Sequence, residues 1–294
     1  MWLAKRKRIF RLYGKISDEE YLKLLYKNTF KKEPNLINPI TYNEKILWLK
    51  LHWRNPLCYE VADKYTVRSY VKECGCEKIL LPLLAHGNSL SEIDFESLPN
   101  EFAIKTSHDS GGVFICENKN DINTFKNGLA LIERHLSKKH TNTFLEWVYD
   151  KVQPSIVVEP LIKTKDGKSL RDYKFFCFYG EPKYFFVCSD RNKLCKFDFF
   201  DINGNWLKIE NGHPHSRKKP ALPKNLEEMF DYCRKLSHAF PHVRVDLYNV
   251  DGEIYFGELT FFHHGGDEKF EPESFDLILG NEFDLARIPK KEII

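Results

Sequence analysis

The clearest alternation of apolar and polar positions along the chain lies between residues 243 and 261. Alternation with a period of two is typical of a β-strand that buries one face. Val250-Asp-Gly252 separates two such runs, and a three-residue hairpin loop usually ends in a residue with positive φ, which suits Gly252. The pattern therefore predicts a β-hairpin in which Asn249 pairs with Glu253.

In this register the two faces of the predicted hairpin differ in character. The first face is apolar and carries Val243, Val245, Leu247, Tyr255, Leu259 and Phe261. The second face carries Arg244, Asp246, Phe256, Glu258 and Thr260. Arg244 falls opposite Glu258, with Asp246 diagonally beside it, and a slip of one residue would mix the two sets.

These three charged side chains are candidates for a binding site. Two carboxylates and one arginine are costly to desolvate unless they are paired or bind a ligand. Carboxylate oxygens suit Mg²⁺, which proteins often hold through one or two carboxylates together with substrate phosphates. From the pattern alone, an exposed face with an Arg–Glu ion pair is an equally good interpretation.

The first 75 residues predict helices. Ser17-Asp-Glu-Glu20 and Thr41-Tyr-Asn-Glu44 are two capping boxes, each of which opens a helix. Pro56 starts a further helix from Leu57 to Glu73. On it Lys64 and Arg68 lie one turn apart and cannot neutralise each other, so either an outside partner or a solvated face is expected.

From about residue 79 the pattern changes to short strands with few helices. Helices are predicted near residues 121–138 and 225–239. Strands are predicted at Phe102–Thr106, Val113–Cys116, Ser155–Ile162, Asp172–Phe178, Lys183–Cys188, Phe197–Ile202 and Asn205–Ile209. The sequence therefore predicts an α+β fold.

Composition narrows the class of protein. The chain has 294 residues, enough for two or three subdomains, and its net charge of +3 carries no nucleic-acid signature. It has no apolar run of 18 residues and no signal peptide, so we expect a cytoplasmic protein. The eight cysteines form no CxxC motif and are expected to be reduced thiols.

Charge is concentrated at the start of the chain. Residues 1–15 contain no acid and six basic residues, Lys5, Arg6, Lys7, Arg8, Arg11 and Lys15, interleaved with apolar ones. Such a segment can lie on an anionic membrane, here the inner membrane surface. A solvated or disordered basic terminus explains the same residues.

A turn rich in serine and glycine lies between two of the predicted strands. It reads Ser107-His-Asp-Ser-Gly-Gly112 and follows a strand that carries Lys105. Backbone N–H groups of such a turn can lie over phosphates, although similar hairpin turns without a ligand are common.

The order and spacing of these segments resemble an ATP-grasp ligase. The whole chain is similar to the teichuronopeptide-biosynthesis (TupA-like) ATP-grasp proteins, which are encoded among bacterial capsule and cell-surface polysaccharide genes. The matching segments extend from about Pro39 to Pro272. They are residues 39–46 with 48–50, Asp63-Lys-Tyr65 with Val67-Arg68, His108-Asp-Ser-Gly-Gly112, residues 172–178, Val243-Arg-Val-Asp-Leu-Tyr248 and residues 255–261.

The resemblance implies two α+β subdomains that clamp a nucleotide, preceded by a helical N-terminal region. The implied parts are a basic segment at 1–15, a helical region at 16–98, a lid subdomain at 99–158 and a larger subdomain at 159–294 that carries the metal-binding hairpin.

The resemblance also implies a role for individual residues. The nucleotide-binding set is Lys105, Ser110, Gly111, Gly112, Glu159, Pro160, Leu161, Asp172 and Lys174. The metal set is Asp246, Glu258 and Thr260, the last at a position where many ATP-grasp enzymes have asparagine. The catalytic pair is Arg244 and Lys174, and possible substrate contacts are His108, Asp109, His263 and His264.

The function that the resemblance implies is an ATP- and Mg²⁺-dependent carboxylate–amine ligase that acts through an acyl phosphate. An amino acid or amine would be joined to a uronic acid or similar acid of a surface polysaccharide or its precursor. The partners would be small-molecule or glycan-linked carboxylates and amines, with no nucleic acid. A glycosyltransferase that uses a nucleotide sugar and an ATP-dependent sugar kinase remain alternatives. The first of these would leave Lys105 and Lys174 without an evident task.

Overall fold

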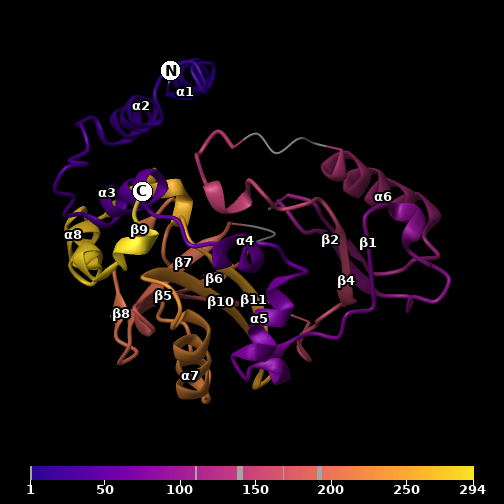
Figure 1. Ribbon diagram of the computed structural model, residues 1–294. Helices are drawn as coiled ribbons and strands as arrows, with labels where there is room; N and C mark the ends of the chain where they lie inside the picture. The colour runs from indigo at the N-terminus through magenta and orange to yellow at the C-terminus, as the bar shows by residue number, and fades with distance from the viewer. Residues whose placement is uncertain (1, 110, 138–141, 168, 191–193) are drawn as a thin grey trace.

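The computed structural model describes residues 2–109, 111–137, 142–167, 169–190 and 194–294. Two antiparallel sheets form two bodies, and N-terminal helices lie against the larger one (Figure 1). The mixture of helices and antiparallel sheets confirms the predicted α+β class.

The chain begins with five helices. They are α1 (Trp2–Phe10), α2 (Asp18–Phe30), α3 (Tyr42–His52), α4 (Leu57–Val61) and α5 (Val67–Glu73). Both predicted capping boxes are present: Ser17 caps α2 together with Glu20, and Thr41 caps α3 together with Glu44. Each box satisfies backbone N–H groups that the first helical turn leaves without a partner.

The prediction of one helix from Leu57 to Glu73 is wrong, because the chain breaks between α4 and α5. The carboxylate of Asp63 accepts hydrogen bonds from the backbone N–H groups of Tyr65 and Thr66, each at 2.8 Å. Short polar side chains compete in this way with helical hydrogen bonds. The break matters for function because it turns Lys64 toward the interior.

The smaller body is built on four strands, which we call the lid sheet, in the order β1-β4-β2-β3. The strands are β1 (Ala85–Gly87), β2 (Phe102–Thr106), β3 (Val113–Cys116) and β4 (Ile156–Pro160). Helix α6 (Ile122–Leu136), which Asp121 caps, packs on β2 and β3. A Cβ at Gly128 of α6 would lie 2.3 Å from the Phe114 ring, so the helix and sheet approach closely only at a glycine.

The larger body is built on six strands, which we call the core sheet, in the order β11-β10-β5-β6-β7-β8. They are β5 (Asp172–Phe178), β6 (Glu181–Ser189), β7 (Lys196–Asp201), β8 (Trp206–Leu207), β10 (His242–Val250) and β11 (Glu253–Thr260). A two-stranded sheet, β9 (Glu210–Asn211) with β12 (Phe270–Glu271), lies beside it. The other α-helices are α7 (Leu226–Ser237) and α8 (Ser274–Asn281). Short 3₁₀ turns are η1 (Glu77–Ile79), η2 (Leu90–Glu92), η3 (Trp147–Tyr149), η4 (His263–Gly266), η5 (Leu285–Arg287) and η6 (Lys290–Glu292).

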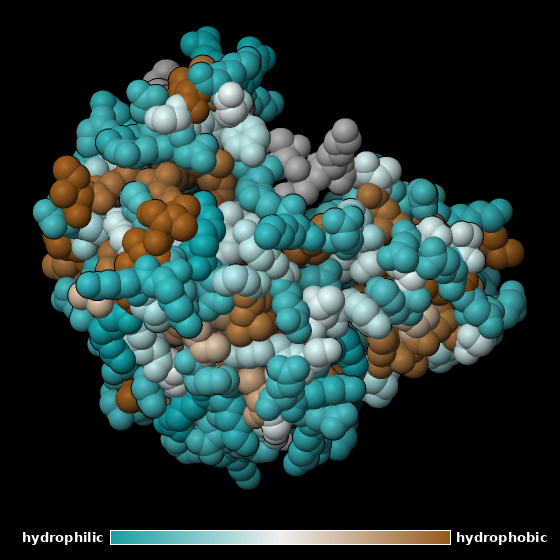
Figure 2. Space-filling model, viewed as in Figure 1, coloured by the Kyte–Doolittle hydropathy of each residue, from teal (hydrophilic) through white to brown (hydrophobic). Residues whose placement is uncertain are grey.

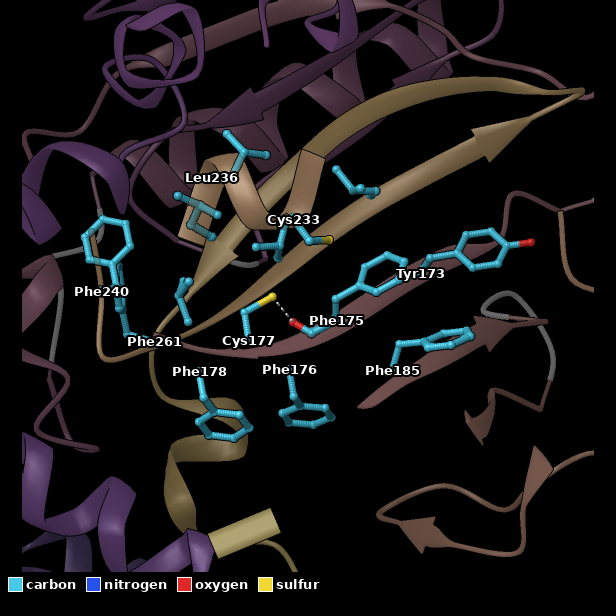
Figure 3. Packing of buried hydrophobic residues seen from close by; sticks show 14 of the residues in the cluster. Tyr173, Phe175, Phe176, Cys177, Phe178, Phe185, Cys233, Leu236, Phe240 and Phe261 are labelled. Atoms are coloured by element: carbon cyan, nitrogen blue, oxygen red, sulfur yellow. Dashed lines mark hydrogen bonds between the residues drawn. The ribbon is translucent and has the colours of Figure 1, made fainter. Parts of the chain in front are cut away.

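Strand β5 is buried on both faces, which explains its run of aromatic residues. Phe175 points toward α7, where its ring meets Phe230 edge-on at 5.6 Å (Figure 3). Phe176 points to the opposite face and meets Tyr42 of α3 edge-on at 5.7 Å. Side chains alternate along a strand, so helices on both sides of the sheet demand a continuous apolar run.

The hairpin of β10 and β11 forms, but its predicted register is wrong. The loop has two residues, Asp251 and Gly252, both with positive φ, and Val250 pairs with Glu253. An Asp-Gly pair favours this tight turn, whose twist matches that of the strands.

A bulge near Gly257 then shifts the pairing by one residue. Beyond it Asp246 faces Glu258, and Arg244 faces Thr260. A Cβ at Gly257 would lie 2.8 Å from the carbonyl oxygen of Asp246, so this close approach requires glycine. The two-residue loop already places Phe256 opposite Leu247 on the apolar face and Tyr255 opposite Tyr248 on the other face, which corrects the faces predicted for both residues.

Candidate active site

A cavity of about 640 Å³ lies where the lid sheet, the core sheet and the N-terminal helices meet. In the space-filling view the surface is indented between the lobe that carries α1 and α2 and the lid (Figure 2). Side chains from all three parts line the cavity, among them Arg6, Lys64, His108, Asp109, Glu146, Lys174, Arg244, Glu258, Thr260, His263 and His264.

Asp246 is the centre of the charged network at one end of this cavity. Its carboxylate accepts two hydrogen bonds of 2.7 Å from Arg244, and Lys174 donates to the same group. Burial alone would raise the pKa of Asp246, but the charges of Arg244 and Lys174 lower it below its ordinary value. Asp246 is therefore a carboxylate, and the predicted catalytic pair is held on it.

Glu258 and Thr260 complete the predicted metal set. Nη2 of Arg244 lies 3.0 Å from the Thr260 hydroxyl and 3.5 Å from Oε1 of Glu258. The Glu258 side chain is 48% exposed, so it is the open member of the set, whereas Asp246 is enclosed by its cations. Over the described residues, no cluster of three or more His, Cys, Asp or Glu residues forms a ready metal site.

This donor set fits a hard divalent cation. Two carboxylates on adjacent strands and one hydroxyl supply only oxygen ligands, the kind that Mg²⁺ takes. They are too few to enclose it, which suits an ion that keeps waters and shares phosphate oxygens. Lys174 would have to leave Asp246 for that carboxylate to bind the cation.

His263 orients Arg244. Nη1 of Arg244 donates to Nδ1 of His263 at 2.6 Å, and Nε2 of His263 donates to Oδ1 of Asn211 at 2.8 Å. Burial and the neighbouring positive groups lower the pKa of His263 well below its ordinary value, which agrees with a neutral ring that accepts at Nδ1. Asn211 had no signal in the sequence, because it is brought here by the small sheet.

His264 has a different position. Its backbone φ is 48°, and its exposed side chain lines the cavity near the ring of Phe197, 6.1 Å away. A role for His264 in contacting a substrate stays a prediction.

Lys105 and Glu159 are joined on the lid sheet. Nζ of Lys105 donates to Glu159 at 2.7 Å, and Arg68 of α5 donates to the other carboxylate oxygen at 3.1 Å. Arg68 therefore has an outside partner, and the interpretation of a solvated face is wrong for it. Pro160 ends β4 directly after Glu159, and Leu161 follows. The predicted nucleotide-binding run from Glu159 to Leu161 thus begins at an ion network.

Asp109 organises the turn of the lid. It accepts hydrogen bonds from the Thr106 hydroxyl, from the Gly112 N–H at 3.0 Å and from His135. Burial would raise its pKa, but the hydrogen bonds from Thr106 and His135 lower it to about 2. A Cβ at Gly112 would lie 1.9 Å from the Thr106 hydroxyl, so only glycine fits there.

The other predicted nucleotide- and substrate-contacting residues differ in what can be said of them. Gly111 packs against the ring of His135, where a Cβ would lie 2.9 Å away. Ser110 lies outside the described residues. His108 is buried and lines the cavity. Asp172 is buried with its carboxylate 3.4 Å from Nζ of Lys174, in the same strand.

Lys64 is a cavity residue that the sequence analysis did not include in the site. Its ammonium group donates to the carbonyl oxygens of Thr106 at 3.0 Å and Ser107 at 3.4 Å, and also to that of Asp109. Burial lowers its pKa. The segment Asp63-Lys-Tyr65 was part of the resemblance, so that motif was the signal that could have identified it.

The basic N-terminal segment is packed onto the protein. Arg6 forms a 2.9 Å ion pair with the buried Asp267, and Phe10 meets the ring of Phe144 edge-on at 5.7 Å. Ile9 is buried in a cluster with α2. Among the side chains described in this segment, the exposed cations are those of Lys7, Arg8, Arg11 and Lys15. None of the described helices is long and apolar enough to cross a membrane.

Comparison with protein families decides the class. The TupA-like ATPgrasp family matches residues 44–284, which is most of the chain. The chain belongs to the TupA-like ATP-grasp family. The predicted resemblance and the ATP-grasp fold are thereby confirmed. No curated protein matches the chain.

Several solved ATP-grasp structures are similar at low identity. The D-alanine–D-alanine ligase of Bacillus anthracis complexed with ATP is 16% identical, over 69% of this chain and 55% of its own, with a TM-score of 0.42. That of Helicobacter pylori is 14% identical over 83% of this chain and 69% of its own, with a TM-score of 0.43. The L-amino acid ligase of Bacillus licheniformis is 13% identical over 72% of this chain and 46% of its own, with a TM-score of 0.45. This TupA-like chain thus spans about half the length of the first of these ligases.

Proposed function

We propose that the protein is an ATP- and Mg²⁺-dependent carboxylate–amine ligase that acts through an acyl phosphate. The observation that supports this most is the network at the cavity, where Arg244 and Lys174 share Asp246 and Glu258 stands open beside them. Membership of the TupA-like ATP-grasp family supports the use of ATP.

The side chains present suit phosphoryl transfer. A carboxylate is a poor acyl donor, and its phosphorylation by ATP creates a leaving group that an amine can displace. Such transfer is catalysed mainly by positioning and by fixed positive charge. In this proposal Arg244 and Lys174 supply that charge at the transferring group, and Lys105 contacts the phosphates after it leaves Glu159. Asp246, Glu258 and Thr260 would hold Mg²⁺, which would neutralise phosphate charge.

The nucleotide would lie between the two sheets. The turn that contains Ser110, Gly111 and Gly112, all three in the predicted nucleotide-binding set, would lie over the phosphates. The segment from Glu159 to Leu161 would contact adenine, and Asp172 would contact the ribose. Closure of the lid would keep water away from the acyl phosphate.

We further propose that the acid is a uronic acid or similar acid of a bacterial surface polysaccharide or its precursor, and that the amine is an amino acid or simple amine. The family resemblance supports this setting. A cytoplasmic protein held at the inner membrane surface is consistent with it, because Lys7, Arg8, Arg11 and Lys15 are exposed on one segment.

Calorimetry with ATP, with and without Mg²⁺, tests the proposal first. We expect Mg²⁺-dependent binding that is lost in the double variant Asp246→Asn/Glu258→Gln. Release of free phosphate in the presence of both an acid and an amine would then identify a ligase. A sugar kinase would give a phosphorylated product without free phosphate. Binding of nucleotide sugars in place of ATP would favour a glycosyltransferase and contradict the proposal.

A further inference from the structure

Glu146 lines the same cavity as Lys174 and Arg244 and has no role in the function described so far. It precedes η3, in the segment that leads from α6 to β4, and its side chain lines the cavity. Among the residues that the structure describes, none forms a hydrogen bond or ion pair with its carboxylate. A carboxylate in a desolvated place is costly without a cationic partner. This points to a ligand that brings a positive charge.

The groups around Glu146 do not already supply that partner. Lys50 of α3 is buried, but its ammonium group donates to the carbonyl oxygens of Phe144 and Gly265, each at 2.6 Å. Arg244 of β10 is held by Asp246 and His263. Both act on Glu146 only through their charge.

Burial raises the pKa of Glu146, and the charges of Lys50 and Arg244 partly offset this. Other charged and titratable groups that line this cavity include the Arg6–Asp267 ion pair, Glu268 and Tyr149. The negative charges of Glu146 and Glu258 raise the pKa of Tyr149 further, beyond the effect of burial. Glu146, Tyr149 and Glu258 all line this one cavity.

Gly265 keeps the carboxylate reachable. Its φ is 65°, a conformation that favours glycine. A Cβ there would lie 3.5 Å from Oε1 of Glu146 and 3.4 Å from Nζ of Lys50. Any side chain at this position would therefore fill the space beside Glu146 that a ligand needs.

We propose that Glu146 binds the ammonium group of the amine substrate and accepts one of its protons. This inference rests on the proposed ligase function and names the base that the amide-forming step requires. A protonated amine has no free electron pair, so it cannot attack the acyl phosphate until a proton has left.

The step balances as follows. One proton passes from the ammonium group to the Glu146 carboxylate, which becomes a carboxylic acid. The nitrogen electron pair then forms the C–N bond at the acyl carbon while the C–O bond to phosphate breaks with its electrons on the phosphate oxygen. The second N–H proton goes to the departing phosphate. Glu146 returns its proton to solvent before the next turnover.

Hydroxylamine gives a direct test, because it is neutral near pH 7 and needs no base to attack an acyl phosphate. Wild type and Glu146→Gln are incubated with ATP, Mg²⁺ and a panel of uronic acids, with either hydroxylamine or glycine as the amine. For the acid that gives most hydroxamate in the wild type, we expect Glu146→Gln to form hydroxamate at the wild-type rate. Its glycine-dependent rate should fall by about 100-fold at pH 7, the low end for loss of a general base.

The pH profile provides a second readout. In Glu146→Gln the glycine-dependent rate should rise steadily with pH, because the amine must lose its proton to solvent, and it should approach the wild-type rate in alkaline solution. Glu146→Asp, which keeps a carboxylate, should retain part of the activity at pH 7. Glu268→Gln removes an acid from the same cavity and should leave both rates unchanged.

Each outcome bears on a separate claim. Equal loss with hydroxylamine and glycine would assign Glu146 a structural role and overturn the inference. Wild-type glycine rates in Glu146→Gln would overturn it while the ligase function stands. Absence of hydroxamate with every acid in the wild type would contradict the ligase function itself, and the inference would fall with it.

Discussion

Arg244 donates a 2.6 Å hydrogen bond to His263, whose opposite ring nitrogen donates to Asn211 at 2.8 Å. The guanidinium that faces the proposed phosphoryl group is thus fixed on one side by Asp246 and on the other by a neutral histidine. Groups behind a site residue commonly set its orientation, and their loss reduces activity without removing the residue itself.

We expect His263→Leu to lower ATP turnover by about 10- to 100-fold, in the range measured for outer-shell partners of metal ligands. The ring is lost, so Arg244 keeps Asp246 but can rotate. Asn211→Leu should show a smaller effect of the same kind. Affinity for ATP, measured by calorimetry, should change little in either variant. Unchanged turnover in both variants would show that Asp246 alone orients Arg244.

A second prediction separates the two metal-set carboxylates by their effect on stability. Asp246→Asn leaves Arg244 and Lys174 buried without their shared carboxylate, which should cost about 3–5 kcal/mol. Glu258→Gln changes a half-exposed side chain and should cost less than about 1 kcal/mol. Urea unfolding at pH 7 measures both.

The same two variants should be alike in function. Each should lose Mg²⁺-dependent turnover, and Glu258→Gln should do so with its fold intact. If Glu258→Gln turned over ATP like the wild type, the assignment of this residue to the metal set would be wrong.

Much of this site could be predicted from the sequence, because the relevant signals are local. The capping boxes at Ser17 and Thr41 depend on residues three apart, and strands β2, β5 and β10 on their own periodicity. The family resemblance supplied roles for Lys105 and Lys174. None of these required knowledge of which segments meet in space.

What could not be predicted depends on contacts between distant segments. At the bulge the backbone of Gly257 lies too close to the Asp246 carbonyl for any other residue, and alternation alone cannot place an extra residue. Asn211 and Glu146 lie on segments without a strong pattern. They enter the site only because the small sheet and the segment before η3 fold against the core sheet.

A third prediction concerns the lid. Lys105→Ala should weaken ATP binding by about 10-fold. One charge-assisted hydrogen bond to phosphate contributes at most about 1.5–3 kcal/mol. Part of this is offset, because in the variant no Lys105–Glu159 ion pair has to break when ATP binds. Calorimetry at fixed Mg²⁺ measures it. Lys126→Ala, on the exposed face of α6, is the matched control and should bind ATP as the wild type does. Equal affinities for Lys105→Ala and the wild type would refute the phosphate contact.

A fourth prediction is a dependence of stability on pH. His242 is buried between Tyr42 and the Cys177 carbonyl, and burial lowers its pKa from 6.5 to about 3. The unfolded chain binds a proton at His242 below about pH 6.5 and the folded chain does not, so stability falls as the pH drops toward 3. This group alone contributes a slope of at most about 1.4 kcal/mol per pH unit.

Urea unfolding between pH 7 and pH 4 measures that slope. His242→Gln should be less stable than the wild type at pH 7 but should lose less stability on acidification. His238→Gln, at an exposed position, should keep the wild-type slope. A His242→Gln slope equal to that of the wild type would mean that other groups dominate the acid response.

The last prediction concerns the N-terminal segment, in which apolar and basic residues have separate tasks. Ile9 is buried against α2, and Arg6 is bound to Asp267, so neither is available to a membrane. Among the side chains of this segment that the structure describes, the exposed cations can then attract anionic lipid, at about 1 kcal/mol each. Replacing Lys7, Arg8, Arg11 and Lys15 by Gln should therefore abolish co-sedimentation with phosphatidylglycerol vesicles while ATP binding is unchanged. Binding of the wild type should weaken steeply with salt, because exposed charges are screened. Wild-type protein that ignores such vesicles at low salt would exclude membrane attachment by this segment.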